Sequence, residues 1–129
     1  MKGLVIFLIM IAVPAVIGLY WIIKPKVVRK RRMRLRERPS REGLEGVLSR
    51  NIGLYSLLPD DLRAELHGHV NVFLNEKRFL GVGGQEITQE VQYTIAGIAC
   101  ILLLKKEPSY FPGFSSILVY PDTYETPQI

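Results

Sequence analysis

The chain of 129 residues is long enough for one small domain and an additional segment, and its single cysteine excludes an intrachain disulfide and a cysteine-based zinc site. Its net charge of +5 is unevenly distributed, because residues 24–41 contain ten Lys or Arg and one acid, whereas residues 42–129 contain six basic and eleven acidic residues. The region after the basic segment is therefore mildly acidic, which argues against a nucleic-acid-binding face on it.

The first predicted element is a transmembrane helix. Residues 3–23 form a run of twenty-one residues without a formal charge, and a helix of that length reaches roughly 32 Å, enough for a hydrocarbon core of about 30 Å. A cleaved signal peptide is the alternative, but the run is longer than the usual ~7–15 residues and no small-x-small pattern follows Ala15. We therefore predict an anchor over residues 1–23, kinked at Pro14. Its predicted lipid-facing and interfacial residues are Leu4, Phe7, Tyr20 and Trp21.

A basic linker is predicted over residues 24–41. Because only Lys2 and the amino terminus precede the span, the positive-inside bias places the C-terminal side in the cytoplasm. The linker is interpreted as a topology determinant and spacer, or as a basic helix attracted to anionic headgroups. A nucleic-acid tail is the third interpretation, and the position beside the membrane disfavours it. Pro39 and Ser40 mark the domain boundary. The predicted headgroup contacts are Lys24, Lys26, Arg29, Lys30, Arg31 and Arg32.

The next region, from residue 42 to Leu58, is predicted as a short helix followed by an extended connector. A longer amphipathic helix is then predicted from Leu62 to Phe79. Pro59 and the aspartates after it are typical of a helix start, and Lys77 and Arg78 would complement the C-terminal end of the helix dipole. The inner stripe of this helix is predicted to contain Leu62, Leu66, Val70, Phe73 and Leu74.

Two histidines, His67 and His69, lie two positions apart on this predicted helix, so they point about 200° away from each other. That spacing does not allow them to hold one metal between them. In the His-Glu-x-x-His pattern, by contrast, two histidines four positions apart share a helix face. We therefore expect surface histidines.

Three glycines lie in the segment 81–84, which suggests either a phosphate-binding loop or a turn that needs positive φ. No Lys-Ser/Thr pair follows, and the adjacent Glu86 would repel an anion. We therefore predict the turn.

The following helix is predicted from Thr88, its N-cap, to Leu104. It is too short and too polar in its first turns for a second span, and its second half is so apolar that a buried core helix is expected. Its predicted inner stripe is Val91, Ile95, Ala99 and Leu102. Cys100 is expected to be a small buried hydrophobe. The apolar surface from Ile95 to Leu104 is expected to be incompletely covered, which would mark a missing partner or an aggregation risk.

A strand from Ser116 to Tyr120, closed by Pro121, and a loop tail over residues 122–129 complete the chain. The segment from Gln85 to Ile87 is the candidate partner strand. The predicted fold class is α+β and mainly helical. It combines a transmembrane helix, a basic linker and, over residues 42–121, a domain with two main helices and one or two short strands.

Three sequence blocks between Leu54 and Pro121 resemble the Mlc titration factor A family of zinc-dependent peptidases. These blocks are EKRF-x-G-x-G-G-x-EIT-x-EV, TIAG-x-AC-x-LLL and SILVYP, in that order. The motif residues, interpreted as structural, are Phe79, Gly81, Gly83, Gly84, Glu86, Thr88, Ala99, Cys100, Val119, Tyr120 and Pro121.

The resemblance implies part of a zincin-like domain. Similar proteins continue after the Val-Tyr-Pro strand into a helix bearing His-Glu-x-x-His, with a further ligand downstream. This chain has no positions that match those ligands, so neither a catalytic nor a metal-binding residue is predicted in it. We expect a membrane-anchored N-terminal fragment of a zinc metallopeptidase, inactive alone, with zinc bound only in the full-length family.

The partners expected from this interpretation are membrane lipids, the missing catalytic half and a cytosolic regulatory protein, with no nucleic acid. The alternative function is a non-catalytic, membrane-tethered module that binds such a regulatory protein.

Overall fold

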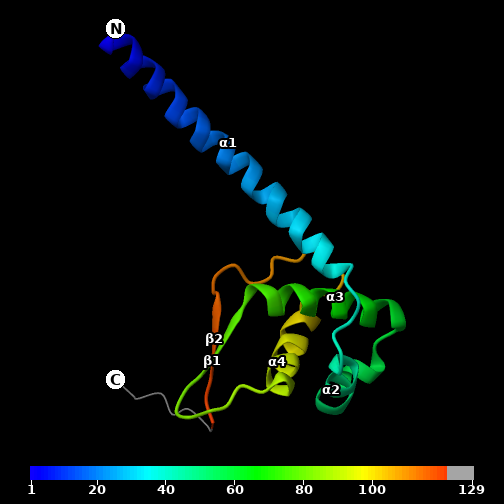
Figure 1. The fold of residues 1–129 in the computed structure, drawn as a ribbon. Helices are drawn as coiled ribbons and strands as arrows, with labels where there is room; N and C mark the ends of the chain where they lie inside the picture. Colours follow the sequence, from blue (N-terminus) through cyan, green and yellow to red (C-terminus); the bar gives the residue numbers. More distant parts are fainter. Residues whose placement is uncertain (122–129) are drawn as a thin grey trace, which may run out of the picture. The chain divides into compact units, whose positions relative to one another are not determined.

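The computed structural model describes residues 1–121, so the predicted loop tail at 122–129 lies outside the described residues. The chain divides into two units, Met1–Arg34 and Leu35–Ile129. The mainly helical α+β class is confirmed (Figure 1). The elements are α1 (Lys2–Arg36), α2 (Leu44–Asn51), the 3₁₀ helix η1 (Gly53–Leu57), α3 (Asp60–Glu76), β1 (Arg78–Gly81), α4 (Gln89–Ile101) and β2 (Ser116–Val119).

The first unit is helical, and α1 runs for 35 residues, through both Pro14 and Pro25. The apolar run and most of the basic linker therefore belong to one continuous helix, which ends at Arg36, before Pro39. Its most apolar 18-residue window has a mean hydropathy of 2.6. Among the described residues, α1 is the one helix long and apolar enough to cross a membrane.

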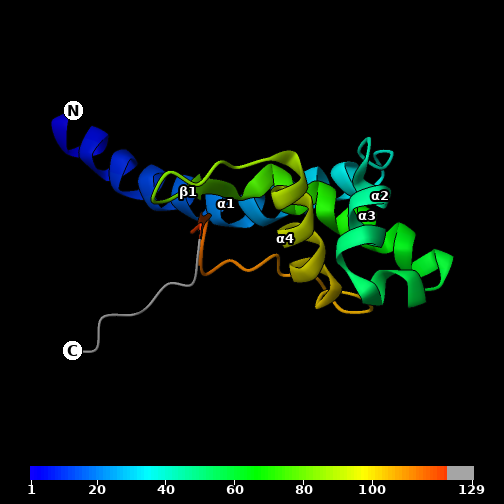
Figure 2. The same cartoon turned by 90° about the horizontal axis from the view of Figure 1, so that it is seen from below.

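The core of the second unit forms where α4 packs against both α3 and α2 (Figure 2). Burial of Leu66, Val70 and Phe73 confirms most of the predicted stripe of α3. The helix is also buried on other sides, since Gly68 and Val72 are inaccessible. The buried hydrophobic residues of the core are Leu35, Leu44, Leu48, Ile52, Tyr55, Leu66, Val70, Val72, Phe73, Tyr93, Ala96, Cys100, Leu103 and Tyr110.

The segment before α3 follows the prediction in part. A short helix is present as α2, and it buries Leu44 and Leu48. The connector is not extended, because Gly53–Leu57 form the turn of 3₁₀ helix η1, which buries Tyr55. Short 3₁₀ pieces are common connectors between α-helices.

The predicted end of α3 is wrong. The helix ends at Glu76 rather than Phe79, and Arg78–Gly81 form strand β1. Lys77 leaves the helix in an extended conformation, with its ammonium group 2.7 Å from the carbonyl oxygen of Phe111 and 2.6 Å from that of Phe114. The Lys77 ammonium group therefore binds a loop that is distant in the sequence, and it does not compensate the dipole at the C-terminal end of α3.

The predicted partner strand at Gln85–Ile87 is also wrong. β2 pairs with β1 in parallel, with Phe79 opposite Ile117 and Leu80 opposite Leu118. Parallel strands need a long crossover connection, and here the crossover contains α4. Phe79 and Ile117 pack on the core, whereas Leu80 and Leu118 lie on the other face and are 49% and 53% exposed.

The start of α4 confirms Thr88 as its N-cap, since the Thr88 hydroxyl accepts a hydrogen bond from the Val91 amide. The helix ends at Ile101, earlier than predicted, and turns follow. The predicted inner stripe is wrong in part: Ala99 packs against the core, but Leu102 is 63% exposed. The side chains on the core side of α4 and its C-terminal turn are instead Tyr93, Ala96, Cys100 and Leu103, together with Gly97.

Candidate functional site

The predicted anchor residues lie along α1 and are exposed. Leu4, Phe7, Tyr20 and Trp21 each expose more than half of their surface. No residue of the most apolar window of α1 is buried. A helix with so much exposed apolar surface needs a bilayer or another apolar partner.

The basic residues after the apolar run surround α1 instead of forming one stripe. At about 100° per residue, the positions of Lys24, Lys26 and Arg31 point in different directions, and Arg29, Lys30 and Arg32 lie between them. This part of the helix therefore has no separate broad apolar face of the kind that lets a helix lie flat in a membrane interface. Lys24 Nζ lies 5.6 Å from the centroid of the Tyr20 ring, within the range of a cation–π interaction.

The glycine segment after β1 is a turn, as predicted. Gly83 and Gly84 have φ values of 63° and 79°, in the left-handed region that favours glycine. Gly81 is restricted for another reason, because a Cβ there would overlap the Gln85 carbonyl oxygen. The turn folds over the end of β2, where the Val82 amide donates to the Val119 carbonyl oxygen at 2.9 Å and Pro121 lies beside Gly83.

The other family-motif residues occupy structural positions. Phe79 lies with its ring centroid 6.4 Å from that of Phe73, and Ala99 packs against the core. Cys100 is fully buried, and burial raises the pKa of its thiol to about 12. A protonated, buried thiol is inert as a nucleophile. Glu86 and Tyr120 are exposed.

His69 is completely buried, so the expected surface position is wrong. Its Nδ1 lies 2.7 Å from the Tyr110 hydroxyl, and its Nε2 lies 3.2 Å from a carboxylate oxygen of Glu65. The Lys105 amide donates to the same Glu65 oxygen at 2.9 Å. Because a carboxylate only accepts hydrogen bonds, we assign the imidazole proton to Nε2, which leaves Nδ1 to accept from Tyr110.

The electrostatics of His69 favour this neutral form. Burial lowers the pKa of His69, the hydrogen bond to Glu65 opposes that effect, and the charge of Arg36 lowers the pKa further. His67 is partly buried and stacks on Tyr55, whose hydroxyl lies 2.7 Å from His67 Nε2. Burial also lowers the pKa of His67 and raises that of Tyr55.

These two histidine–tyrosine contacts were missed at the sequence level. Tyr110 is 41 residues from His69, so no local pattern indicates the contact. The spacing of Glu65 and His69, four positions apart on one helix, is the signal that was available. Tyr55 lies in a segment predicted to be extended, which hid its position beside His67.

The described residues do not fit a zinc site. Among residues 1–121, no group of three or more His, Cys, Asp or Glu side chains could hold a metal ion. Both ring nitrogens of His69 are already hydrogen-bonded, and His67 faces a different tyrosine. A hydrolytic zinc needs three protein ligands and an open position, so we derive no catalytic step from these residues.

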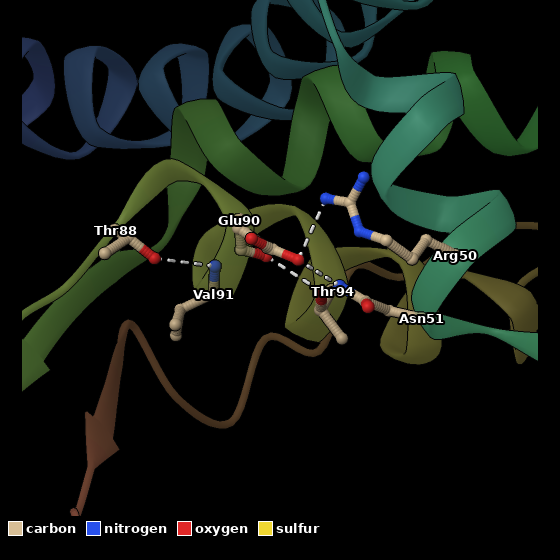
Figure 3. Close-up of polar contacts among 6 residues, drawn as sticks. All are labelled: Arg50, Asn51, Thr88, Glu90, Val91 and Thr94. Atoms are coloured by element: carbon tan, nitrogen blue, oxygen red, sulfur yellow. Dashed lines mark hydrogen bonds and ion pairs between the residues drawn. The ribbon is translucent and has the colours of Figure 1, made fainter.

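A polar cluster joins the end of α2 to the first turns of α4 (Figure 3). One carboxylate oxygen of Glu90 accepts from Arg50 at 3.0 Å and from the Asn51 amide at 2.9 Å. Asn51 also donates to the Thr94 hydroxyl at 3.0 Å. The hydrogen bonds from Asn51 and Arg50 lower the pKa of Glu90. We interpret this exposed cluster as a structural contact that aligns α2 with α4.

Comparison with known proteins identifies the family. Residues 26–129 match the family described as glucose-regulated metallo-peptidase M90. An uncharacterized protein of Synechocystis sp. is 32% identical over 99 residues, which are 77% of this chain and 36% of that relative. The match thus spans little more than a third of the relative's length, and no solved structure matches the chain significantly. Because the family match covers most of the sequence, the chain belongs to the glucose-regulated metallopeptidase family M90.

Proposed function

We propose that this chain is the membrane-anchored N-terminal portion of a zinc-dependent metallopeptidase. The observation that carries the proposal is the family match over residues 26–129. This match begins in α1, where the apolar residues of a helix of membrane-spanning length give way to basic residues. In this proposal residues 1–23 cross the cytoplasmic membrane once. The excess of basic residues after the span favours a cytosolic position for the folded unit.

The basic part of α1 is proposed to contact anionic lipid headgroups. Lys and Arg placed directly after a span are attracted to the negative surface of the cytoplasmic leaflet. Their distribution around the helix supports contact with headgroups on several sides, rather than insertion of one face. The same basic residues would also determine the orientation of the span. We therefore assign both roles, headgroup contact and topology determinant, to this segment.

The second unit is proposed to be the non-catalytic flank of the peptidase domain. Peptide-bond hydrolysis in the whole enzyme requires zinc ligands and a base, and these are proposed to lie in sequence beyond the 129 residues. Two findings support this division. The described residues offer no zinc site, and most of the Synechocystis relative lies outside the matched region. On this proposal the 129 residues alone do not hydrolyse peptides.

A membrane-tethered module that binds a cytosolic regulatory protein is the alternative. The exposed apolar side chains of the second unit favour it, because contiguous apolar surface often marks an interaction site. The largest exposures on its helices are those of Leu54, Leu57, Ile98 and Leu102. The acidic balance of this unit argues against nucleic acid as the partner.

The test compares zinc content and aminopeptidase activity of the purified 129-residue chain with those of the protein extended through the downstream reading frame. We expect stoichiometric zinc and activity in the extended protein alone. Stoichiometric zinc or turnover in the shorter chain would contradict the proposal. A downstream frame without His-Glu-x-x-His, or an extended protein without zinc, would favour the regulatory module.

A further inference from the structure

Helix α4 is apolar on two opposite sides. At about 100° per residue, Val91, Ile95, Ile98 and Leu102 fall within about 60° of one another. We call these four residues the outer stripe. The residues on the core side, Tyr93, Ala96, Gly97, Cys100 and Leu103, are centred on the opposite side of the helix. A helix that is apolar on both sides is typical of an element packed between two layers.

The outer stripe is only partly covered. Ile98 and Leu102 are 55% and 63% exposed, and Val91 and Ile95 are half-buried. Leu102 follows the last assigned helical residue but keeps right-handed helical backbone angles, so it continues the stripe. Four apolar side chains at helical spacing are thus presented along the length of α4.

The borders of the outer stripe favour a protein partner over lipid. On one border Glu90 and Thr94 are engaged with α2 through Asn51, and Gln92 lies on the other border. Interfacial helices have a broad apolar face with Lys or Arg beside it, whereas α4 contains neither Lys nor Arg. Farther along the helix the flanking residues are Ala99 and Ile101, which are partly buried against the core. The exposed stripe therefore stays narrow, as in the seam between two packed helices.

A second surface of the same unit also lacks a covering layer. Leu80 and Leu118 lie opposite each other on the outer face of the parallel strands and are about half exposed. Parallel strands are normally covered on both faces, and two strands rarely form an independent sheet. Both uncovered surfaces fit a domain whose remaining layer lies elsewhere, and the matched relative is long enough to contain such a layer.

We propose that the outer stripe of α4 is the surface on which a helix from the remaining part of the metallopeptidase domain packs. This inference rests on the proposed function and specifies which face of the N-terminal portion the catalytic part contacts. The core side of α4 would then hold the N-terminal portion together, while the outer stripe joins it to the catalytic part.

The test uses cysteine labelling, which is selective because Cys100 is fully buried. Ile98→Cys and Leu102→Cys probe the outer stripe, and Ala64→Cys on the exposed side of α3 is the matched control. Maleimide labelling rates are measured in detergent for the 129-residue chain and for the protein extended through the downstream frame. We expect similar rates for all three cysteines in the shorter chain. In the extended protein, burial should slow both stripe cysteines by about tenfold or more and leave the control unchanged.

Each other outcome overturns the inference. If the extended protein contains zinc and hydrolyses peptides while both stripe cysteines still react rapidly, this inference is wrong and the proposed function stands. Protection that grows with the concentration of the shorter chain would assign the stripe to a second copy. Protection of the shorter chain in vesicles but not in detergent would assign it to lipid. If the extended protein binds no zinc, or if no reading frame continues downstream, the proposed function is wrong and this inference is wrong with it.

Discussion

His69 shows how a single buried polar side chain can connect distant parts of the second unit. Glu65 and His69 lie on α3, and through them the helix binds Lys105 and Tyr110 in the segment between α4 and β2. Lys105 and Tyr110 have positive φ values of 58° and 52°, which are unfavourable for residues other than glycine. The hydrogen bonds to α3 offset this backbone strain. Lys77 contributes to the same effect through its two hydrogen bonds to carbonyl oxygens of that segment.

The neutral state of His69 predicts that the second unit loses stability in acid. Burial lowers the pKa of His69 below the 6.5 of an unperturbed histidine. Below pH 6.5 the unfolded chain therefore binds a proton that the folded chain does not, and the free energy of unfolding falls as pH decreases toward the folded-state pKa. We expect a lower urea midpoint at pH 5.5 than at pH 7.5. Far-UV circular dichroism in detergent, recorded at each of the two pH values, would report unfolding.

Matched variants separate His69 from the other histidine, whose pKa is also lowered by burial. In a His67→Gln variant, the urea midpoint should still fall between pH 7.5 and pH 5.5. A further His69→Gln substitution should reduce that fall. Glu65→Gln keeps an acceptor for Nε2 and Lys105 but removes the charge that supports the imidazolium. It should therefore increase the loss of stability in acid. A midpoint that does not change between the two pH values would rule out a neutral, buried His69.

At the scale of elements, the close packing of α2 on α4 requires a glycine at position 97, because there is no room for a side chain there. A Cβ at this position would overlap Leu48 Cδ2 and lie 2.8 Å from Ile52 Cδ1, and Leu48 is completely buried. Gly97→Ala would gain about 1 kcal/mol of helix propensity, but overpacking of a core costs about 1–3 kcal/mol. We expect a net decrease in the free energy of unfolding.

Gly46 in α2 provides the matched control, since a Cβ there meets nothing within 4 Å. Gly46→Ala should therefore stabilise the unit by about 0.5–1 kcal/mol, the usual gain in a helix interior. Urea unfolding of both variants in detergent measures the difference. Equal stabilisation by the two alanines would show that α2 and α4 are not as closely packed as the structure indicates.

The sequence predicts these elements unequally well, for physical reasons. Thr88 marks the start of α4 because an N-cap acts through local hydrogen bonds. The long apolar helix α1 is evident because such a helix is recognised from composition and length alone. The buried side of α4 was predicted incorrectly, since a helix that is apolar on both sides has no single preferred face. Strand β1 was missed because its pairing with β2 spans a long crossover, and Lys77 contacts a loop that is 34 residues away.

At the scale of the whole molecule, the two units have opposite charge and different surfaces. Residues 1–34 contain eight basic and no acidic residues, whereas residues 35–129 contain nine basic and twelve acidic residues. The first unit is an exposed apolar helix with a basic end, and the second has a core of its own. This division agrees with the proposed cationic anchor. An anionic membrane surface would attract the first unit and weakly repel the second.

The charge asymmetry around the span predicts which side of the membrane carries the second unit. Only Lys2 and the amino terminus precede the apolar run, and basic residues follow it at once. We therefore expect the Ala64→Cys side chain to be cytosolic. A membrane-impermeant maleimide should label it in inside-out vesicles and leave it unmodified in right-side-out vesicles, while buried Cys100 stays silent in both.

Neutralising the basic residues nearest the span tests the cause of this orientation. Lys24→Gln, Lys26→Gln and Arg29→Gln together reduce the charge difference across the span without changing its apolar length. The triple variant should give a mixed population, with part of the Ala64→Cys side chains labelled in right-side-out vesicles. Substitution of Arg36, Arg38 and Arg41 by Gln removes the same number of charges farther from the span and should have a smaller effect, because the bias weakens with distance from the membrane. Labelling of the single Ala64→Cys variant, without the charge substitutions, in right-side-out vesicles would contradict the cytosolic assignment and place the second unit on the opposite side.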